Sequence, residues 1–206
     1  MADLAVFLDK DGTLVEDVPY NVDPARVRLG PGAADGLAAL HAAGYRLVVV
    51  SNQSGVARGL FPEAALRGVE DRLRELLKEI GVPLAGFYYC PHHPNGMVAE
   101  YARPCDCRKP APGLLRRAAA ELGLDLGRAW MVGHILDDVQ AGRAAGCRTV
   151  LLDNGHETEW VRSPDREPDA MVPDLAAAAR VILTSAACGH AGRVSRIAAS
   201  GKGTDQ

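Results

Sequence analysis

Short, continuously apolar runs alternate along this chain with segments that have the composition of helices. The runs lie at residues 4–8, 45–50, 86–89, 129–132 and 148–152, and the helical segments at 32–44, 62–81, 112–123, 136–146 and 173–183. Most runs are too uniformly apolar to form one face of a half-exposed sheet, so we interpret them as buried parallel strands. Alternating strands and helices form βαβ units, whose ligands gather at the carboxyl ends of the strands. The sequence therefore predicts a three-layer α/β sandwich with a mainly parallel sheet.

Composition limits what such a chain can do. The 206 residues are 48% hydrophobic and carry a formal net charge of −3. We expect one domain over residues 1–183, and a disordered tail of small residues over 184–206. A slightly acidic chain without a basic run is not expected to bind nucleic acid, and no apolar run approaches the roughly 18 residues of a membrane span. We therefore expect a cytoplasmic protein, and a monomer.

Two carboxylates mark the end of the first predicted strand. Asp9 and Asp11 stand two residues apart in the stretch FLDKDGT. Residues two apart point to the same side of an extended chain, so both carboxylates can face one ligand. One can attack as a nucleophile while the other holds and releases a proton. An isolated pair of this kind is often a solvated turn, but the apolar strand before it and the Gly-Thr after it favour the catalytic interpretation.

Two further polar residues suit a phosphorylated ligand. Ser51 follows the second predicted strand in VVVSNQSG, and Lys109 lies in CRKP. A hydroxyl and free backbone N–H groups can hold phosphate oxygens without adding charge, and a lysine offsets the charge of a phosphate beside two carboxylates. Taken alone, the serine is explained equally well by a helix cap and the lysine by a solvated loop. Their order after FLDKDGT favours a site for a small phosphorylated substrate.

A cluster of cysteine and histidine residues occupies the long loop over residues 90–109. The spacing is Cys90-x-His92, then twelve residues, then Cys105-x-Cys107. Four such ligands can close around one tetrahedral Zn²⁺, and a complete ligand set leaves no open position for substrate. We therefore predict a structural zinc ion, with His93 as an alternative ligand to His92. Cysteines gathered in this way favour a metal site over a disulfide framework, so no structural disulfide is expected.

These segments resemble the motifs of the haloacid-dehalogenase-like (HAD) phosphatases, which have a Rossmann-like fold. The resemblance implies that Asp9 forms an aspartyl-phosphate, that Asp11 is the general acid/base and that Ser51 and Lys109 bind the transferring phosphate. It also implies a Mg²⁺ ion held by the Asp9 carboxylate, the Asp11 backbone carbonyl and Asp138.

The stretches NQSGVARG, YYCPHHP and CDCRKP narrow the resemblance to the subfamily of heptose 1,7-bisphosphate phosphatases and histidinol-phosphate phosphatases. The resemblance covers roughly residues 4–155, includes the zinc-stapled loop and implies no large cap domain. The implied reaction is hydrolysis of the C7 phosphate of D-glycero-D-manno-heptose 1,7-bisphosphate, with histidinol phosphate as the alternative substrate. The implied substrate contacts are Asp17, Tyr20, Ser51, Asn52, Gln53, Ser54, Arg108 and Lys109.

The fourth motif departs from the family pattern. That pattern is G-D-x-x-x-D, and in GHILDD the second position is Asp138 whereas the first is His134. Mg²⁺ prefers oxygen ligands and rarely accepts imidazole. Asp137 lies three residues further along a predicted helix, so it cannot simply replace the missing carboxylate.

Three interpretations of His134 stay open. The chain is a phosphatase whose metal site is completed by Asp137, Asp138 or water, or which uses an ion such as Mn²⁺ or Co²⁺. Alternatively, catalysis is weakened and the fold binds a phosphosugar or a protein partner. In the third interpretation, the histidine was introduced, or is incidental, in an otherwise ordinary enzyme.

Overall fold

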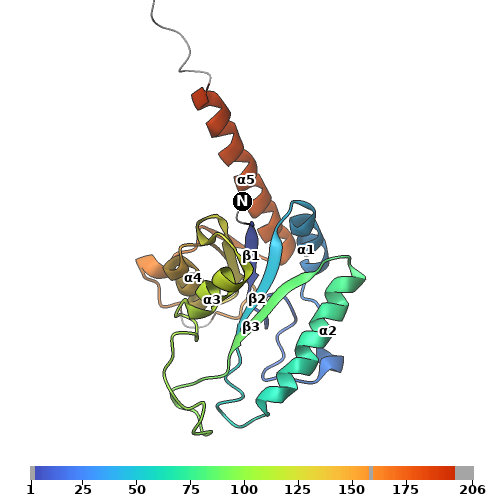
Figure 1. Ribbon diagram of the computed structural model, residues 1–206, viewed down its shortest axis with the longest axis vertical. Coiled ribbons are helices and arrows are strands. Elements are labelled where there is room, and N and C mark those ends of the chain that lie inside the picture. The colour runs from blue at the N-terminus through green and yellow to red at the C-terminus, as the bar shows by residue number, and fades with distance from the viewer. Residues whose placement is uncertain (1–2, 158–159, 198–206) are drawn as a thin grey trace, which may run out of the picture.

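The computed structural model describes residues 3–157 and 160–197, with side chains described as far as residue 186. Its centre is one six-stranded sheet in the order β3-β2-β1-β4-β5-β6, in which every neighbouring pair is parallel. Figure 1 shows β1, β2 and β3 side by side. The strands are β1 (Ala5–Leu8), β2 (Arg46–Asn52), β3 (Leu84–Cys90), β4 (Trp130–Gly133), β5 (Arg148–Leu152) and β6 (Ala170–Val172). The predicted parallel sheet is confirmed.

Helices cover both faces of the sheet. They are α1 (Ala33–Ala42), α2 (Leu66–Glu79), α3 (Gly113–Leu122), α4 (Leu136–Ala145) and α5 (Leu175–Ile197). Apolar side chains of α1, α2 and α5 pack in one core with Val6 and Leu8 of β1, and those of α3 and α4 pack in a second core with Ala5 and Phe7. Because alternate residues of a strand point to opposite faces, β1 is buried on both sides. The three-layer sandwich is therefore also confirmed.

The helices begin and end much as their sequences predict. In α2 the buried residues Leu66, Val69, Leu73 and Leu77 recur at the three- and four-residue spacing of one helix face. Helix α4 ends at Gly146, which has a left-handed backbone (φ 94°) that a glycine adopts without strain. The apolar faces pack the helices against the sheet, and the helix ends leave the carboxyl ends of the strands to be followed by polar loops.

Two elements differ from the sequence-based expectation. The short strand β6 was not predicted, because its apolar run has only three residues, of which Met171 is exposed. Helix α5 continues past residue 183 to Ile197, over a segment that contains no proline to stop a helix. The structure thus describes residues 184–197 as helix where the sequence predicted a disordered tail, while residues 198–206 lie outside the described part of the chain.

The topology brings three strand ends together. Strand β1 lies between β2 and β4. The strands that follow β1 in the sequence are added first on one side of it, as β2 and β3, and then on the other side, as β4, β5 and β6. Ligands of open parallel sheets bind outside the carboxyl ends of strands at such a switch point. Among the described helices, none is long and apolar enough to cross a membrane.

Candidate active site

Three charged side chains form the buried centre of this edge. Asp9 follows β1, Asp138 lies in the first turn of α4, and Lys109 comes from the loop between β3 and α3. Lys109 Nζ lies 2.6 Å from Asp9 Oδ1 and 2.6 Å from Asp138 Oδ1, and it also donates to the carbonyl oxygen of Val50 at 2.9 Å. All three charged residues are buried. The site is therefore built on one ammonium group shared by two carboxylates.

The close approach of these charges shifts their pKa values. Burial raises the pKa of Asp9, but the Lys109 ammonium and the His134 ring outweigh burial and hold it well below its ordinary value. Burial lowers the pKa of Lys109, but the two carboxylates outweigh burial and raise it. Burial also keeps the pKa of Asp138 above its ordinary value. Asp9 is therefore an anion and Lys109 a cation at neutral pH, as a nucleophile and a phosphate ligand require.

Asp11 lies beside this centre in a different environment. Lys10 Nζ lies 2.7 Å from Asp11 Oδ1, and Gln53 Nε2 donates both to Asp11 Oδ2 at 3.2 Å and to Ser51 Oγ at 2.8 Å. Burial raises the pKa of Asp11 above its ordinary value although the Lys10 ammonium opposes this. A carboxyl group with a raised pKa can carry and release a proton near neutral pH. The structure thus gives Asp9 and Asp11 environments suited to different roles.

Asn52 fixes the backbone of the loop that carries Lys109. Its Nδ2 donates to the Lys109 carbonyl oxygen at 3.0 Å, and its Oδ1 accepts from the Lys109 N–H at 3.0 Å. Both ends of the amide are therefore used within the protein. Asn52, which the resemblance implies is a substrate contact, here joins the end of β2 to the loop and positions the lysine.

His134 occupies the turn between β4 and α4 and points Nδ1 toward the carboxylate pair. This nitrogen lies 3.1 Å from Asp9 Oδ2, 3.8 Å from Asp138 Oδ2 and 3.3 Å from Thr13 Oγ1. Burial lowers the pKa of His134, but the hydrogen bond to Asp9 and the nearby carboxylates outweigh burial and raise it. One ligand atom from each of Asp9, His134 and Asp138 lies within 4.8 Å of the other two. The structure therefore brings these three side chains together as one donor set.

This donor set suits Mg²⁺ only in part. Asp9 and Asp138 offer the carboxylate oxygens that this ion prefers, but the third side-chain donor is an imidazole nitrogen, which does not fit it. Asp137 does not belong to this group of donors, and its Oδ1 instead lies 2.6 Å from Arg166 Nη2. The departure from the family motif therefore persists in three dimensions.

The loop after β5 also borders the site, and sequence reasoning missed it. The His156 ring lies edge-on to the His134 ring, with 5.5 Å between their centroids. Asn154 Nδ2 donates to the Gly12 carbonyl oxygen at 2.7 Å, and Glu157 Oε2 accepts from the first backbone N–H of α4 at 2.7 Å. A signal was available, because the loop directly follows a buried strand and strand ends share one edge of a parallel sheet.

The remaining predicted substrate residues lie outside the buried charged centre. Arg108 is half-buried, and its Nη1 is a buried atom without a hydrogen-bond partner among the described residues. Asp17 and Tyr20 are exposed, and Asp17 lines a cavity of about 270 Å³ together with His156. Ser54 is half-buried. Of these four side chains, Arg108 has the clearest capacity to bind an anion.

The cysteine and histidine side chains of the loop over residues 90–109 converge on one point. The sulfur atoms of Cys90, Cys105 and Cys107 lie 3.1–3.5 Å from one another, and His92 Nδ1 lies 3.4 Å from Cys107 Sγ and 3.6 Å from Cys90 Sγ. Zinc–sulfur bonds of about 2.3 Å give a tetrahedron with edges of about 3.8 Å, close to this arrangement. His93 Nδ1 instead accepts a backbone N–H at 3.1 Å. The structure therefore selects His92 over His93 as the fourth donor.

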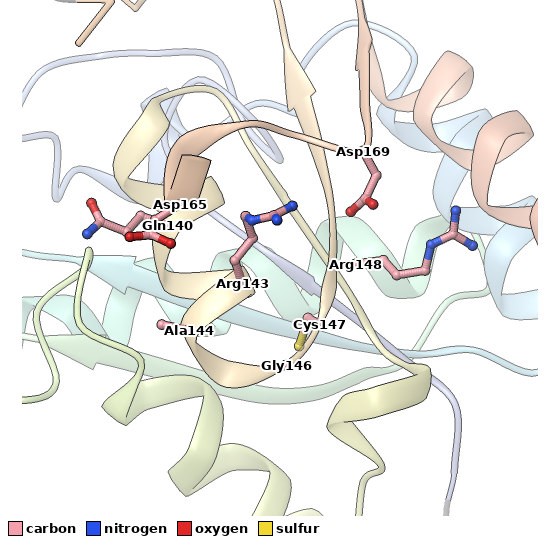
Figure 2. Close-up of a pocket in the computed structure, with 8 residues that line it drawn as sticks. All are labelled: Gln140, Arg143, Ala144, Gly146, Cys147, Arg148, Asp165 and Asp169. Atoms are coloured by element: carbon pink, nitrogen blue, oxygen red, sulfur yellow. The ribbon is translucent and has the colours of Figure 1, made fainter. Parts of the chain in front are cut away.

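A separate cavity of about 560 Å³ lies at the amino end of β5, whereas the charged centre lies at the carboxyl ends of the strands (Figure 2). Its lining residues are Gln140, Arg143, Ala144, Gly146, Cys147, Arg148, Asp165 and Asp169. Arg148 begins β5, so the cavity borders the amino ends of the strands. Two of its charged groups have partners within the protein, since Arg148 stacks on the Trp130 ring and Asp169 accepts from the Thr149 N–H. None of the residues that line this cavity belongs to the charged centre around Lys109.

Known proteins share the sequence over most of this chain. A family model described as HAD-hydrolase-like matches residues 106–178. The D-glycero-β-D-manno-heptose-1,7-bisphosphate 7-phosphatase of Yersinia pestis is 42% identical over 148 residues, which are 72% of this chain and 79% of that protein. The enzyme of the same name from Escherichia coli K12 is 43% identical, over 72% of this chain and 78% of its own.

Solved structures share the fold. The D,D-heptose 1,7-bisphosphate phosphatase from B. bronchiseptica, crystallised in complex with magnesium and phosphate, superposes with a TM-score of 0.71 and is 32% identical. This match covers 90% of the present chain and 99% of the other. A candidate HAD-like phosphatase from Mesorhizobium loti superposes with a TM-score of 0.75 and is 37% identical, over 88% of both chains.

Proposed function

Because this chain belongs to the HAD-like phosphatases, in the family of the heptose-1,7-bisphosphate 7-phosphatases, we propose that it removes the C7 phosphate of D-glycero-D-manno-heptose 1,7-bisphosphate. The enzyme class follows from the family. The substrate is carried over from the names of relatives that are 42–43% identical over 148 residues. A small phosphorylated sugar is therefore the ligand for which the site is interpreted below.

The observation that carries the proposal is the pairing of two carboxylates in opposite environments. Asp9 is held as an anion by Lys109, whereas burial keeps the pKa of Asp11 raised. Phosphoryl transfer through an aspartyl-phosphate requires one carboxylate that attacks and one that handles protons. Divergent pKa values in neighbouring acids are the usual physical sign of this division of roles.

The residues then perform the reaction in two steps. The Asp9 carboxylate attacks phosphorus, the bond to the sugar oxygen breaks, and Asp11 gives its proton to that oxygen. Asp11 next takes a proton from a water molecule, which attacks the aspartyl-phosphate and releases inorganic phosphate and free Asp9. Lys109 and the Ser51 hydroxyl hold the phosphate oxygens in both steps, which limits the build-up of negative charge beside Asp9.

Two metal sites accompany this chemistry. A divalent cation between Asp9, Asp138 and His134 would neutralise charge on the phosphate, although the imidazole disfavours Mg²⁺ as that cation. Zn²⁺ bound by Cys90, His92 and the two following cysteines, Cys105 and Cys107, would order the loop that ends at Lys109.

Substrate recognition falls to residues around the opening of the site. Arg108 is the natural ligand for phosphate oxygens, because its buried Nη1 lacks a partner and a guanidinium matches anionic oxygens in pairs. Ser54 lies just after the end of β2, and Asp17 and Tyr20 project from the loop after the first motif. We assign these three residues to the sugar and its second phosphate as a group. Gln53 is buried and donates to Asp11 and Ser51, so we assign it to positioning those two side chains.

His134 favours a second candidate function. If the imidazole prevents binding of the required cation, the same pocket would hold a phosphosugar without hydrolysing it. Histidinol phosphate is the alternative substrate within the enzyme class, because the loop motifs resemble both groups of phosphatases. The three candidate functions differ in whether the protein releases inorganic phosphate and in the compound from which it releases it.

A phosphate-release screen separates these outcomes. The full-length protein is assayed with both anomers of heptose 1,7-bisphosphate and with histidinol phosphate, each in Mg²⁺, Mn²⁺ and Co²⁺. The proposal predicts release from a heptose bisphosphate at least about tenfold faster in kcat/KM than from histidinol phosphate. Faster release from histidinol phosphate would contradict the proposed substrate. No release with any ion, together with saturable binding of heptose bisphosphate, would favour a protein that binds the phosphosugar without hydrolysing it.

A further inference from the structure

The carboxylate pair at the centre of the site has two distinct sides. Lys109 Nζ contacts Oδ1 of Asp9 and Oδ1 of Asp138, each at 2.6 Å. His134 Nδ1 faces the other oxygen of each carboxylate, at 3.1 Å from Asp9 Oδ2 and 3.8 Å from Asp138 Oδ2. The lysine and the histidine therefore do not compete for the same atoms. An ion bound on the histidine side would leave the lysine contacts in place.

The histidine ring is held in the orientation that aims Nδ1 at these oxygens. A β-carbon added to Gly12, whose φ is +68°, would lie 2.9 Å from His134 Cδ2, so the ring packs directly over the glycine backbone. The His156 ring meets it edge-on, with 5.5 Å between the two ring centroids. A metal ligand needs this restraint, because neighbouring groups set its direction.

The chemistry of the three donors determines which ion they suit. Two carboxylate oxygens and one imidazole nitrogen form a mixed set, and imidazole suits the borderline first-row ions, whereas oxygen alone suits Mg²⁺. Affinity for such mixed sites generally rises from Mn²⁺ toward the later ions of the series. The site therefore differs from an all-oxygen site in the ions that it should prefer.

We propose that His134 is a direct metal ligand and that the active site selects a first-row transition ion, such as Mn²⁺ or Co²⁺, over Mg²⁺. The inference concerns the site of the proposed phosphatase and rests on that function for its biological meaning. The identity of the bound ion and of the ligand atom can be tested independently of phosphatase activity. His134 in this view changes the cofactor of the fold without removing the site.

The test measures binding and ligation directly. Full-length protein, loaded with one equivalent of Zn²⁺ to fill the cysteine loop, is titrated with Mn²⁺ while free Mn²⁺ is followed by electron paramagnetic resonance. Competition with Mg²⁺ gives the ratio of the two affinities. Electron spin echo spectra of the bound Mn²⁺ then report whether a ¹⁴N nucleus is directly coordinated.

The wild-type protein is expected to show a ¹⁴N coupling. Its ratio of Mn²⁺ affinity to Mg²⁺ affinity is expected to exceed the same ratio in the variant His134→Asp. His134→Asp should lose the coupling and reduce the ratio of affinities by about 10- to 100-fold. His41→Asp, which makes the same change at an exposed position of α1, should leave both unchanged. The wild-type spectrum needs no variant, so it decides the question even if His134→Asp does not fold.

Two outcomes would overturn the proposal. Mn²⁺ bound by the wild-type protein without ¹⁴N coupling would show that His134 is not a ligand. Binding of neither ion by the wild-type protein would show that the histidine blocks the site. Phosphate release is measured in parallel, so a failure of the proposed function appears as absent turnover with an intact ¹⁴N coupling, which leaves the ligand assignment standing.

Discussion

At the scale of single residues, the account rests on how a few buried charges share partners. Lys109 is the common partner of Asp9 and Asp138, while Asp11 is paired with Lys10. The desolvation free energy of a buried ion is offset only when the ion has an oppositely charged partner. Removal of one ion therefore leaves its former partner as an uncompensated buried charge. Activity and stability therefore depend on the same side chains.

Lys109→Met tests the shared ammonium. Two buried carboxylates would lose their cation, so we expect a loss of about 3–5 kcal/mol in the free energy of unfolding at pH 7, measured by urea denaturation. In the folded wild-type protein the pKa of Asp9 is lowered, so its pairing stabilises the fold above the unfolded pKa of about 3.9 and this contribution fades as pH falls. The deficit of the variant should accordingly begin to shrink only as pH falls below about 4.

The matched control is Lys78→Met, at an exposed position in α2. It should change the free energy of unfolding by no more than about 0.5 kcal/mol. Equal stability of Lys109→Met and the control at pH 7 would show that the charged centre is not held together as described.

Asp11→Asn tests the general acid. An amide cannot give a proton to the leaving sugar oxygen, so kcat for heptose bisphosphate should fall by about 10²–10⁴-fold. The fall should be smaller for p-nitrophenyl phosphate, whose leaving group needs no proton. Equal losses on both substrates would argue that Asp11 acts only through the structure of the site.

At the scale of elements, the turn between β4 and α4 sets the position of Asp138. A β-carbon on Gly133 would lie 2.2 Å from Asp138 Cβ, a distance that only a shift of the helix start could relieve. Backbone N–H groups of His134 and Ile135 meanwhile donate to Asp138 Oδ2 at 3.1 and 3.3 Å. The glycine is required so that the first turn of α4 can close over the strand end.

Gly133→Ala should therefore destabilise the protein by at least about 1–3 kcal/mol and lower phosphate release further than stability alone explains. Gly127→Ala is the control, because a β-carbon there meets an atom at 3.4 Å, an ordinary contact. Thermal unfolding and kcat measured on both variants check the prediction. A Gly133→Ala protein with wild-type kcat would contradict the role of this turn in placing Asp138.

The cysteine loop is the second element whose order can be tested. Removal of zinc by a strong chelator should allow iodoacetamide to label Cys105 and Cys107 at pH 8 and should allow proteolysis within residues 90–109. Cys147 should stay unlabelled, because burial raises the pKa of its thiol to about 12. Peptide mass mapping reads all three sites. Equal labelling of Cys105 and Cys107 before and after chelation would argue against a bound ion.

At the scale of the whole molecule, the arrangement of the sheet could be predicted because its signals are local. Each core strand is a continuous apolar run, and the rule that parallel strand ends share an edge places Asp9, Ser51 and His134 together. Strand β6 and the end of α5 escaped prediction, since β6 has only three residues and the end of α5 lies in a segment of small and polar residues without a clear helix stop.

The finer part of the site depends on packing that no local pattern contains. Lys10 stands between Asp9 and Asp11 in the sequence, and nothing in its neighbours shows that it is buried against Asp11. Nor does the spacing of Asp137 and Asp138 show that one pairs with Arg166 and the other with Lys109. Such partners come from distant segments and are fixed only when the layers close.

The most direct test of the whole account is phosphate release from heptose 1,7-bisphosphate by the wild-type protein and by Asp9→Asn, assayed with the preferred divalent ion. The account predicts turnover by the wild-type protein and a loss on the order of 10³-fold or more in the variant, since an amide cannot form the aspartyl-phosphate. Circular dichroism of Asp9→Asn verifies that the variant is folded. A folded Asp9→Asn protein that keeps turnover within about tenfold of wild type would contradict the assignment of Asp9 as the nucleophile.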